Sequence, residues 1–234
     1  MLTKTDDDSN TLFSDRYQQT YHSTFGAQAE SAHVFLHGSG VHDRLKSNRP
    51  TRVLEIGFGL GLNCLLCADS AASNTTLLSY TGIEHAPISA STLIELNYAH
   101  LLSSPILAND LAQLFSGLGP NLGGTAFGLL GQYCQVILHT ADATSGVLLE
   151  KLGNEPKYDA IFLDAFSPDV NPECWTHAFM RQIRSFLAPK GRLATYCVKG
   201  SVRRNLVAAG FRVNKYPGPK GKREVLWAKL ASIE

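Results

Sequence analysis

The sequence predicts a doubly wound α/β fold with a mostly parallel sheet. Between residues 52 and 209, short apolar runs that suit buried strands alternate with longer segments of helical composition. A glycine-rich turn follows the first of these strands, as in α/β folds whose backbone approaches a ligand closely. The segments 211–216 and 224–230 leave no room for a helix between them, so they predict a closing antiparallel hairpin.

Each element of this pattern follows from its local composition. The strands 52–57 (RVLEIG) and 158–164 (YDAIFLD) are nearly continuous apolar runs, which is typical of strands covered on both faces. Residues 117–131 hold six glycines and predict a loop. The order of elements matches the Rossmann-like plan of class I S-adenosyl-L-methionine (SAM)-dependent methyltransferases, with a cofactor at the carboxyl ends of the central strands. The other strands are predicted at 77–84, 134–140 and 192–198, and the helices at 60–72, 89–102, 105–115, 145–152, 175–187 and 201–209.

The segment before the first parallel strand has a different composition. Residues 1–11 are polar, and we expect them to be frayed. Residues 12–21 carry enough aromatic and β-branched side chains for a short hairpin. Residues 27–45 predict a helix that is broken near Gly38 and Gly40.

The length of 234 residues suits one catalytic domain, residues 51–234, with a small N-terminal extension, residues 1–50, packed on it. Apolar residues make up 44% and charged residues 18% of the chain, which excludes a disordered protein, a collagen and a small disulfide scaffold. No apolar run approaches the roughly 18 residues that span a bilayer. The N-terminus carries Asp6, Asp7 and Asp8 where a secretory signal would be basic and then apolar, so we expect a cytoplasmic protein.

The five cysteines are odd in number and lack a paired framework, which suits a reducing compartment. Cys64 and Cys67 form a CxxC motif, a pattern that can serve redox chemistry or hold a metal. The motif lies in an apolar stretch, however, and no second CxxC or histidine pair accompanies it. We therefore interpret both cysteines as small buried residues of a helix and expect no metal site.

The strongest local signal is the segment 55–61 (EIGFGLG). Gly57, Gly59 and Gly61 let the backbone turn tightly beside a ligand, and the helix that follows presents free amide donors to a carboxylate. The spacing GxGxG differs from the GxGxxG of dinucleotide sites, and Glu55 stands two residues before the first glycine. This is the methyltransferase form, in which the glycines pass beside the methionine part of the cofactor. A purely structural turn is the alternative.

Two further acids end predicted strands. Glu84 lies where a carboxylate can accept hydrogen bonds from both ribose hydroxyls, and an exposed strand-end glutamate is the alternative. Asp142 lies where methyltransferases place a carboxylate near the adenine amino group, although an aspartate there can also cap a helix. Asn63, beside the glycine turn, and Ala143, beside Asp142, complete the predicted cofactor-binding residues.

Asp164 follows the fourth parallel strand and opens the segment DAFSP. A carboxylate at that point can accept N–H bonds from a substrate amine and remove its proton during methyl transfer. Phe166 and Pro168 would supply the wall of the pocket, as an aromatic residue and a proline do in amino methyltransferases with a DPPY-type loop. A simple turn is the alternative.

The charges are unevenly distributed along the chain. Residues 1–180 hold 8 basic and 18 acidic residues, whereas residues 181–234 hold 13 basic and 2 acidic residues. Because so little acid compensates these basic residues within their own segment, they predict contact with a phosphate backbone, with a solvated face as the alternative. The residues expected to make that contact are Lys199, Arg203, Arg204, Lys220, Lys222 and Arg223.

Several longer segments resemble one family, the methyltransferase module of MnmC. They are 33–41 (HVFLHGSGV), 53–63 (VLEIGFGLGLN), 80–84 (YTGIE), 161–175 (IFLDAFSPDVNPECW) and 218–226 (GPKGKREVL). The resemblance implies methyl transfer from SAM to the exocyclic amine of 5-aminomethyl-(2-thio)uridine at wobble position 34 of tRNA. It also implies that Asp164 faces this amine in a pocket shaped by Phe166 and Pro168, and that the cofactor is bound by Glu55, Gly57, Gly59, Gly61, Glu84 and Asp142.

Bifunctional members of that family carry a flavin oxidoreductase domain that generates the aminomethyl group. The present chain ends at Glu234, so it resembles a stand-alone form that would need a separate enzyme to supply its substrate.

Two other functions fit part of the sequence. A small-molecule N-methyltransferase or an aminopropyltransferase-like enzyme would use the same cofactor site but would not need the basic C-terminal segment. A catalytically silent RNA-binding protein would not need Glu55, Glu84 and Asp164, and the presence of all three argues against it.

Overall fold

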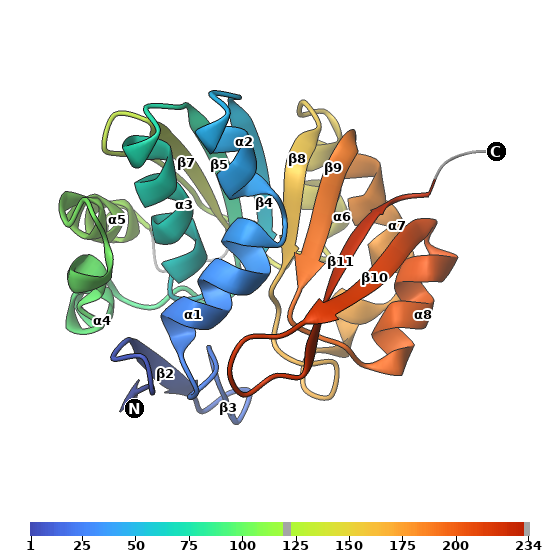
Figure 1. Cartoon of the computed structure of the whole chain (residues 1–234), viewed down its shortest axis with the longest axis horizontal. Coiled ribbons are helices and arrows are strands. Elements are labelled where there is room, and N and C mark those ends of the chain that lie inside the picture. Colours follow the sequence, from blue (N-terminus) through green and yellow to red (C-terminus); the bar gives the residue numbers. More distant parts are fainter. Residues whose placement is uncertain (119–122, 232–234) are drawn as a thin grey trace.

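The computed structural model describes residues 1–118 and 123–231, and within them two sheets are present (Figure 1). The large sheet has eight strands in the order β10-β11-β9-β8-β4-β5-β7-β6, and most of its strands are parallel, which confirms the predicted α/β fold. Its strands are β4 (Thr51–Ile56), β5 (Leu78–Glu84), β6 (Thr125–Leu130), β7 (Cys134–Thr140), β8 (Tyr158–Leu163), β9 (Leu187–Thr195), β10 (Phe211–Pro217) and β11 (Glu224–Leu230).

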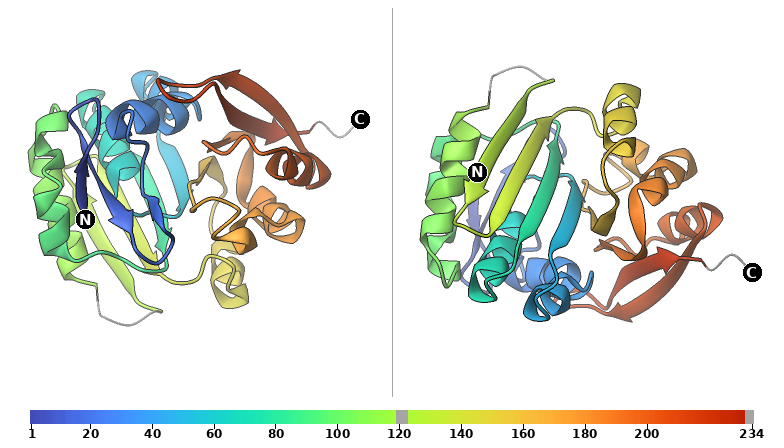
Figure 2. Two further views of the ribbon diagram at one scale, coloured as in Figure 1. Left: turned by 90° about the horizontal axis from the view of Figure 1, so that it is seen from below. Right: turned by 90° about the horizontal axis from the view of Figure 1, so that it is seen from above.

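The helices form one layer on each face of this sheet (Figure 2). Each layer closes its own hydrophobic core, because α3 to α5 pack with one set of buried side chains and α6 to α8 with another. The helices are α1 (Ala27–Ser31), α2 (Val41–Lys46), α3 (Leu62–Ser73), α4 (Ala90–Glu95), α5 (Ile106–Ser116), α6 (Gly146–Gly153), α7 (His177–Phe186) and α8 (Gly200–Ala208).

The central strand β4 is parallel to β5 on one side and to β8 on the other. Its side chains Val53, Leu54 and Ile56 are fully buried, as its apolar run requires. The helix after β4, α3, belongs to one layer, and the helix after β8, α7, belongs to the other. The chain therefore leaves the carboxyl ends of β4 and β8 toward opposite faces, which opens a crevice between them.

The C-terminal hairpin has the predicted antiparallel arrangement. β11 is inserted between β9 and β10 and runs antiparallel to both. The segment that connects β10 to β11 extends to the same end of the molecule as the carboxyl ends of the parallel strands (Figure 1). The hairpin therefore brings residues near 220 close to the crevice.

The N-terminal segment forms a second, small sheet of β1 (Leu2–Lys4), β2 (Asn10–Ser14) and β3 (Gln19–Thr20). The predicted hairpin is confirmed, but the expected fraying of residues 1–11 is wrong. Leu2 pairs with Leu12 in an antiparallel ladder, so these polar residues are fixed by backbone hydrogen bonds. This sheet also lies at the carboxyl ends of the parallel strands (Figure 2).

The first helical segment breaks where the sequence predicts. α1 continues into a π-helix, Ala32–His37, and α2 begins after Gly40, which has a left-handed backbone. The predicted helix 89–102 is instead two short ones, α4 and a 3-10 helix at Tyr98–Leu101. Asn97 separates them because its φ of 51° is incompatible with a continuous helix.

The glycine-rich segment 117–131 is not a loop throughout. Residues 119–122 lie outside the described residues, but Thr125–Leu130 forms β6, an antiparallel edge strand paired with β7. Ala126 and Leu130 are buried against the layer of α5, while Phe127 and Leu129 are exposed. The alternation of buried and exposed side chains is difficult to recognise in the sequence, because Gly128, which lies against Leu114, has no side chain.

Candidate active site

A cavity of about 890 Å³ opens at the carboxyl ends of β4, β5, β7 and β8. Its floor comes from the turns after these strands, and its sides come from the N-terminal sheet and the β10–β11 connection. Among the residues predicted to act at the site, those that line the cavity are Gly57, Gly59, Glu84, Asp142, Ala143, Asp164, Phe166 and Lys222.

The glycine turn forms the part of the cavity next to β4. Gly57 has a φ of 86°, and a side-chain carbon placed on it would lie 2.7 Å from the carbonyl oxygen of Asp164, so only glycine fits. Gly59 has a φ of 52°, and its N–H donates to Oε2 of Glu84 at 2.8 Å. Oε1 of Glu84 accepts from the N–H of Ala86, also at 2.8 Å. The ends of β4 and β5 are thereby held together as one rigid surface.

Asp142 lies at the rim of the cavity after β7. Its Oδ1 accepts from the N–H of Thr144 at 2.8 Å and from the Thr144 hydroxyl at 2.7 Å. Partial burial raises the pKa of Asp142, but the bonds from Thr144 outweigh this effect and leave the pKa below its ordinary value. Asp142 is therefore a carboxylate at neutral pH, and it both shapes the turn before α6 and lines the cavity.

Behind the glycine turn, a chain of buried hydrogen bonds connects β5 to the end of β8. The Tyr80 hydroxyl donates to Oε2 of Glu55 at 2.7 Å, and Nδ2 of Asn63 donates to Oε1 of Glu55 at 2.7 Å. The same Asn63 nitrogen also donates to Oδ2 of Asp164 at 2.8 Å. Burial raises the pKa of Glu55 to about 8, although these two donors oppose the shift. Glu55, Asn63 and Gly61 are not among the described residues that line the cavity.

Asp164 faces the cavity at the end of β8. Its pKa is raised well above the ordinary value, first by burial and then by the charges of Glu55 and Glu30. The hydrogen bond from Asn63 and the charge of Lys222 oppose this rise. The carboxyl group of Asp164 therefore holds its proton to higher pH than an exposed aspartate does.

An aromatic wall lines the cavity beside the glycine turn, with Tyr21 against Gly59. The ring of Phe166 stacks on Tyr17 with the centroids 4.2 Å apart and meets Tyr21 edge-on at 5.0 Å. Nε2 of Gln19 donates to the Ser167 hydroxyl at 2.8 Å, so the N-terminal hairpin is fastened to the loop after β8. Pro168 lies in the next turn and is not among the described residues lining the cavity.

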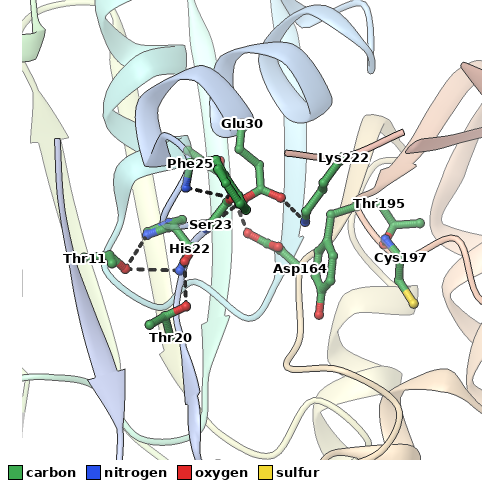
Figure 3. A network of polar contacts seen from close by, with 12 residues as sticks. Thr11, Thr20, His22, Ser23, Phe25, Glu30, Asp164, Thr195, Cys197 and Lys222 are labelled. Atoms are coloured by element: carbon green, nitrogen blue, oxygen red, sulfur yellow. Dashed lines mark hydrogen bonds and ion pairs between the residues drawn. The ribbon is translucent and has the colours of Figure 1, made fainter. Parts of the chain in front are cut away.

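Charged residues from the two ends of the chain meet beside Asp164 (Figure 3). The ammonium of Lys222 pairs with Glu30, a buried residue of α1, and Oε2 of Glu30 accepts from the N–H of Ser23 at 2.8 Å. The Lys222 nitrogen also lies 4.2 Å from the centroid of the Tyr196 ring. Lys222 therefore lines the cavity, with its ammonium paired to Glu30.

The other predicted basic residues are partly neutralised by acids from the first part of the chain. Lys199 pairs with Asp169, and Lys220 pairs with Asp6 at 2.9 Å. In the folded protein, acids that are distant in sequence therefore compensate these two lysines. Arg203 and Arg204 on α8, and Arg223 before β11, are exposed.

The two CxxC cysteines are not among the described residues that line the cavity. Cys64 and Cys67 are fully buried in α3 as free thiols, which confirms their interpretation as buried helix residues. Over residues 1–118 and 123–231, no cluster of three or more His, Cys, Asp or Glu side chains is arranged to hold a metal ion. None of the helices in the same ranges has both the length and the hydropathy needed to span a membrane.

Comparison with known proteins agrees with this geometry. Residues 118–231 match a family described as S-adenosyl-L-methionine-dependent methyltransferase. The chain is 36% identical over 225 residues to the tRNA 5-methylaminomethyl-2-thiouridine biosynthesis bifunctional protein MnmC of Paracidovorax citrulli (strain AAC00-1), which covers 94% of this chain and 34% of that protein. Residues 118–231 belong to this family of SAM-dependent methyltransferases.

Two more relatives support this assignment. The MnmC protein of Cupriavidus metallidurans is 34% identical over 227 residues, covering 95% of this chain and 33% of that protein. The crystal structure of MNMC2 from Aquifex aeolicus superposes with a TM-score of 0.73 at 26% identity, covering 100% of this chain and 72% of the other. The methyltransferase thus spans about a third of the length of the curated relatives that it matches.

The described cavity fits the cofactor of this family. The glycine turn leaves the backbone bare at Gly57, where a methionine moiety can approach. α3 begins at Leu62, directly after Gly61 and without a side-chain cap, and none of its residues is among the described residues that line the cavity. Glu84 and Asp142 line the cavity beyond this turn, and each carboxylate oxygen can accept more than one hydrogen bond.

Sequence reasoning missed four side chains of the methyltransferase cavity. Tyr17 and Tyr21 were recognised only as strand-forming residues, and Tyr196 only as part of a strand. Glu30 was missed altogether, although a single acid within the apolar helical run 27–36 is a signal that could have found it.

Proposed function

We propose that this protein methylates the exocyclic amine of 5-aminomethyl-(2-thio)uridine at wobble position 34 of tRNA, giving the 5-methylaminomethyl product. The observation that carries the proposal is the position of Asp164, between the bare backbone of Gly57 and the aromatic wall of Phe166. The names of the MnmC relatives, which refer to 5-methylaminomethyl-2-thiouridine in tRNA, support this choice of substrate.

For the cofactor, we propose direct contact with the predicted residues that line the cavity: Gly57, Gly59, Glu84, Asp142 and Ala143. Glu84 would accept from the ribose hydroxyls, and Asp142 would lie near the adenine amino group. We assign Glu55, Asn63 and Gly61 a supporting role, because they lie behind the turn. A side-chain carbon on Gly61 would meet Leu111 at 2.6 Å, which explains this glycine by packing of α3 against α5.

For the chemistry, bound SAM supplies an electrophilic methyl group on a sulfonium. The amine must be neutral to attack, since an alkylammonium has no free electron pair. Asp164 in its ionised form would accept an N–H bond from the amine, orient its electron pair and take up the proton that the nitrogen loses. Phe166, held by Tyr17 and Tyr21, would pack against the base, and the wall would exclude water from the reacting atoms. Pro168 would act only through the turn that carries Phe166.

For the RNA, we propose that Arg203, Arg204 and Arg223 contact phosphates, supported by their exposure to solvent. Lys199 and Lys220 would contribute less, because an acidic partner occupies each of them. We further propose that residues 1–50 act as an extension that completes the substrate side of the domain 51–234. A methyl transfer does not create the amine that it modifies, so a separate enzyme would supply the aminomethyl group.

The test is incubation with SAM and tRNA that carries terminal 5-aminomethyluridine, followed by nucleoside mass spectrometry. We expect the mass of one methyl group to be added to that nucleoside. If a small amine gained the methyl group and the nucleoside did not, the enzyme would be a small-molecule N-methyltransferase. Loss of the nucleoside product in Asp164→Ala, with cofactor binding retained, would tie the reaction to this cavity.

A further inference from the structure

The ion pair between Lys222 and Glu30 is built into the cavity wall from both sides. The Glu30 carboxylate is positioned by its bond from the N–H of Ser23. The Lys222 ammonium rests on the ring of Tyr196, and the Tyr196 hydroxyl donates to the carbonyl oxygen of Ala165 at 2.9 Å. Ala165 is the residue after Asp164, so the support of the lysine is attached to the strand end that carries the proposed base.

Further contacts join the same two regions of the chain. Nε2 of His33 lies 2.8 Å from the carbonyl oxygen of Pro217, and Gly221 lies directly against the ring of Phe25. These contacts place the β10–β11 connection on the N-terminal segment and leave Lys222 little freedom to turn outward. A lysine that only bound phosphate would not need these contacts with Glu30 and Tyr196.

The charges that face Asp164 come from four elements. Glu55 approaches from β4, Glu30 from α1 and Lys222 from the β10–β11 connection, and Tyr196 follows β9. Asn63 on α3 adds a neutral hydrogen bond. Glu30 is the acid whose charge disfavours a second negative charge, and Lys222 is the cation that opposes it, whereas Glu55 keeps its own proton up to a pKa of about 8. Figure 3 shows Glu30, Lys222 and Asp164 directed into the same space.

We propose that Lys222 and Glu30 are an opposed pair of positioning residues for Asp164: Lys222 favours its ionised form and Glu30 favours its protonated form. The inference rests on the proposed function, in which only the ionised form of Asp164 can take a proton from the substrate amine. Lys222 reaches the reaction through Asp164, and so it is not itself a catalytic residue.

The proposal predicts opposite effects from the two halves of one ion pair. Removal of the lysine charge in Lys222→Met leaves Glu30 unopposed, so Asp164 holds its proton to higher pH. In Glu30→Gln, the charge of Lys222 is no longer balanced by Glu30, so Lys222 favours the ionised form of Asp164 more strongly. Asp164 then releases its proton at lower pH. Loss of a purely structural ion pair would impair the enzyme in the same direction whichever partner was removed.

The test is a titration of the Asp164 carboxyl carbon by NMR in protein with ¹³C-labelled aspartate, its signal identified by its absence in Asp164→Asn. We expect the midpoint to rise by about one pH unit or more in Lys222→Met and to fall by a similar amount in Glu30→Gln. Lys222→Arg keeps the charge and should keep the midpoint. Lys220→Met, which removes the exposed pair with Asp6 in the same connection, is the matched control and should leave the midpoint in place.

The pH dependence of kcat for tRNA methylation is the second measurement, and its acid limb should move with the same signs. Shifts of both variants in one direction, or no shift in either, would overturn the proposal. If Lys222→Met does not fold, the downward shift in Glu30→Gln still decides. The titration needs no turnover, so failure to methylate tRNA would refute the proposed function without touching this inference.

Discussion

The two halves of the cavity are built in different ways. On the proposed cofactor side, Gly57, Gly59 and Glu84 come from one continuous strand-helix-strand unit, and a hydrogen bond from the Gly59 N–H joins Gly59 to Glu84. On the proposed substrate side, Gln19 bonds to Ser167 across 148 residues of sequence, and Glu30 pairs with Lys222 across 192. A local motif can therefore reveal the cofactor side, whereas the substrate side exists only once both ends of the chain have folded onto the sheet.

The largest effect should come from filling the bare turn on the cofactor side. Gly59→Val adds a branched side chain at a φ of 52°, where the first added carbon already lies 3.1 Å from the ring of Tyr21. We expect cofactor binding to be lost in calorimetry while the protein remains folded. Unchanged affinity would mean that the cofactor does not pass this turn. Gly146→Val, at a position with no atom within 4 Å of an added carbon, is the control.

The next largest effect should come from Asp164→Asn, which should reduce turnover much more than cofactor affinity. Asp164→Asn keeps the shape of the side chain and the contact with Asn63 but removes the proton acceptor. We expect kcat to fall about a hundredfold or more while cofactor affinity changes only a few-fold. Equal losses in both quantities would show that Asp164 holds the cofactor and does not act on the amine. Rapid-quench turnover and calorimetry on the same preparation measure the two quantities.

The same contrast explains what could be predicted from the sequence. The order of strands follows from apolar runs such as 158–164, and the glycine turn follows from spacing, because both signals lie within a few neighbouring residues. Burial of Cys64 and Cys67 follows from their apolar surroundings. Fold and cofactor side are therefore largely contained in local patterns.

Features that depend on tertiary contacts escaped prediction. Lys222 looks like one more residue of a basic segment until α1 brings Glu30 against it. β6 is hidden because glycine removes the alternation that marks a strand, and its pairing with β7 supplies the missing stabilisation. β1 has too few residues for a pattern and is ordered by β2.

A smaller effect should come from Glu55, which lies behind the glycine turn, and it should appear in the pH dependence of stability. The folded protein holds a proton on Glu55 up to a pKa of about 8, against 4.5 for the ordinary group. Between these two pH values, Glu55 is protonated in the folded state and ionised in the unfolded state. The contribution of Glu55 to the free energy of unfolding is therefore complete below pH 4.5 and is lost as the pH rises through 8. Each pKa unit corresponds to about 1.4 kcal/mol in the free energy of unfolding.

Glu55→Gln should remove this contribution to the pH dependence. The amide imitates the protonated acid, and Oδ1 of Asn63, which has no hydrogen-bond partner among the described residues, can accept from it. Urea unfolding at pH 6 and pH 9 would measure the difference, with Glu150→Gln on the exposed side of α6 as the control. A variant with the same pH dependence as the parent would contradict burial as the cause.

On the substrate side, the aromatic wall should contribute to substrate affinity more than to cofactor affinity. Phe166→Ala removes the ring that stacks on Tyr17 and meets Tyr21. Loss of one aromatic stack costs about 1–3 kcal/mol per base in nucleic-acid binding, so we expect KM for tRNA to rise about tenfold. If the Kd for SAM increased by the same factor, Phe166 would contribute to cofactor binding as much as to tRNA binding, which would contradict the prediction.

The smallest effect should come from the exposed arginines outside the cavity. Arg204→Gln removes one charge from α8, and loss of one phosphate contact lowers the slope of log affinity against log salt by about 0.7 to 0.9. At moderate salt this corresponds to a few-fold weaker tRNA binding with kcat unchanged. Lys157→Gln removes a charge directly before β8, at the amino ends of the parallel strands, whereas the cavity lies at their carboxyl ends. This variant should leave the slope unchanged. Equal slopes in the two variants would mean that α8 does not contact RNA, and the substrate side would then end at the aromatic wall and the Lys222–Glu30 pair.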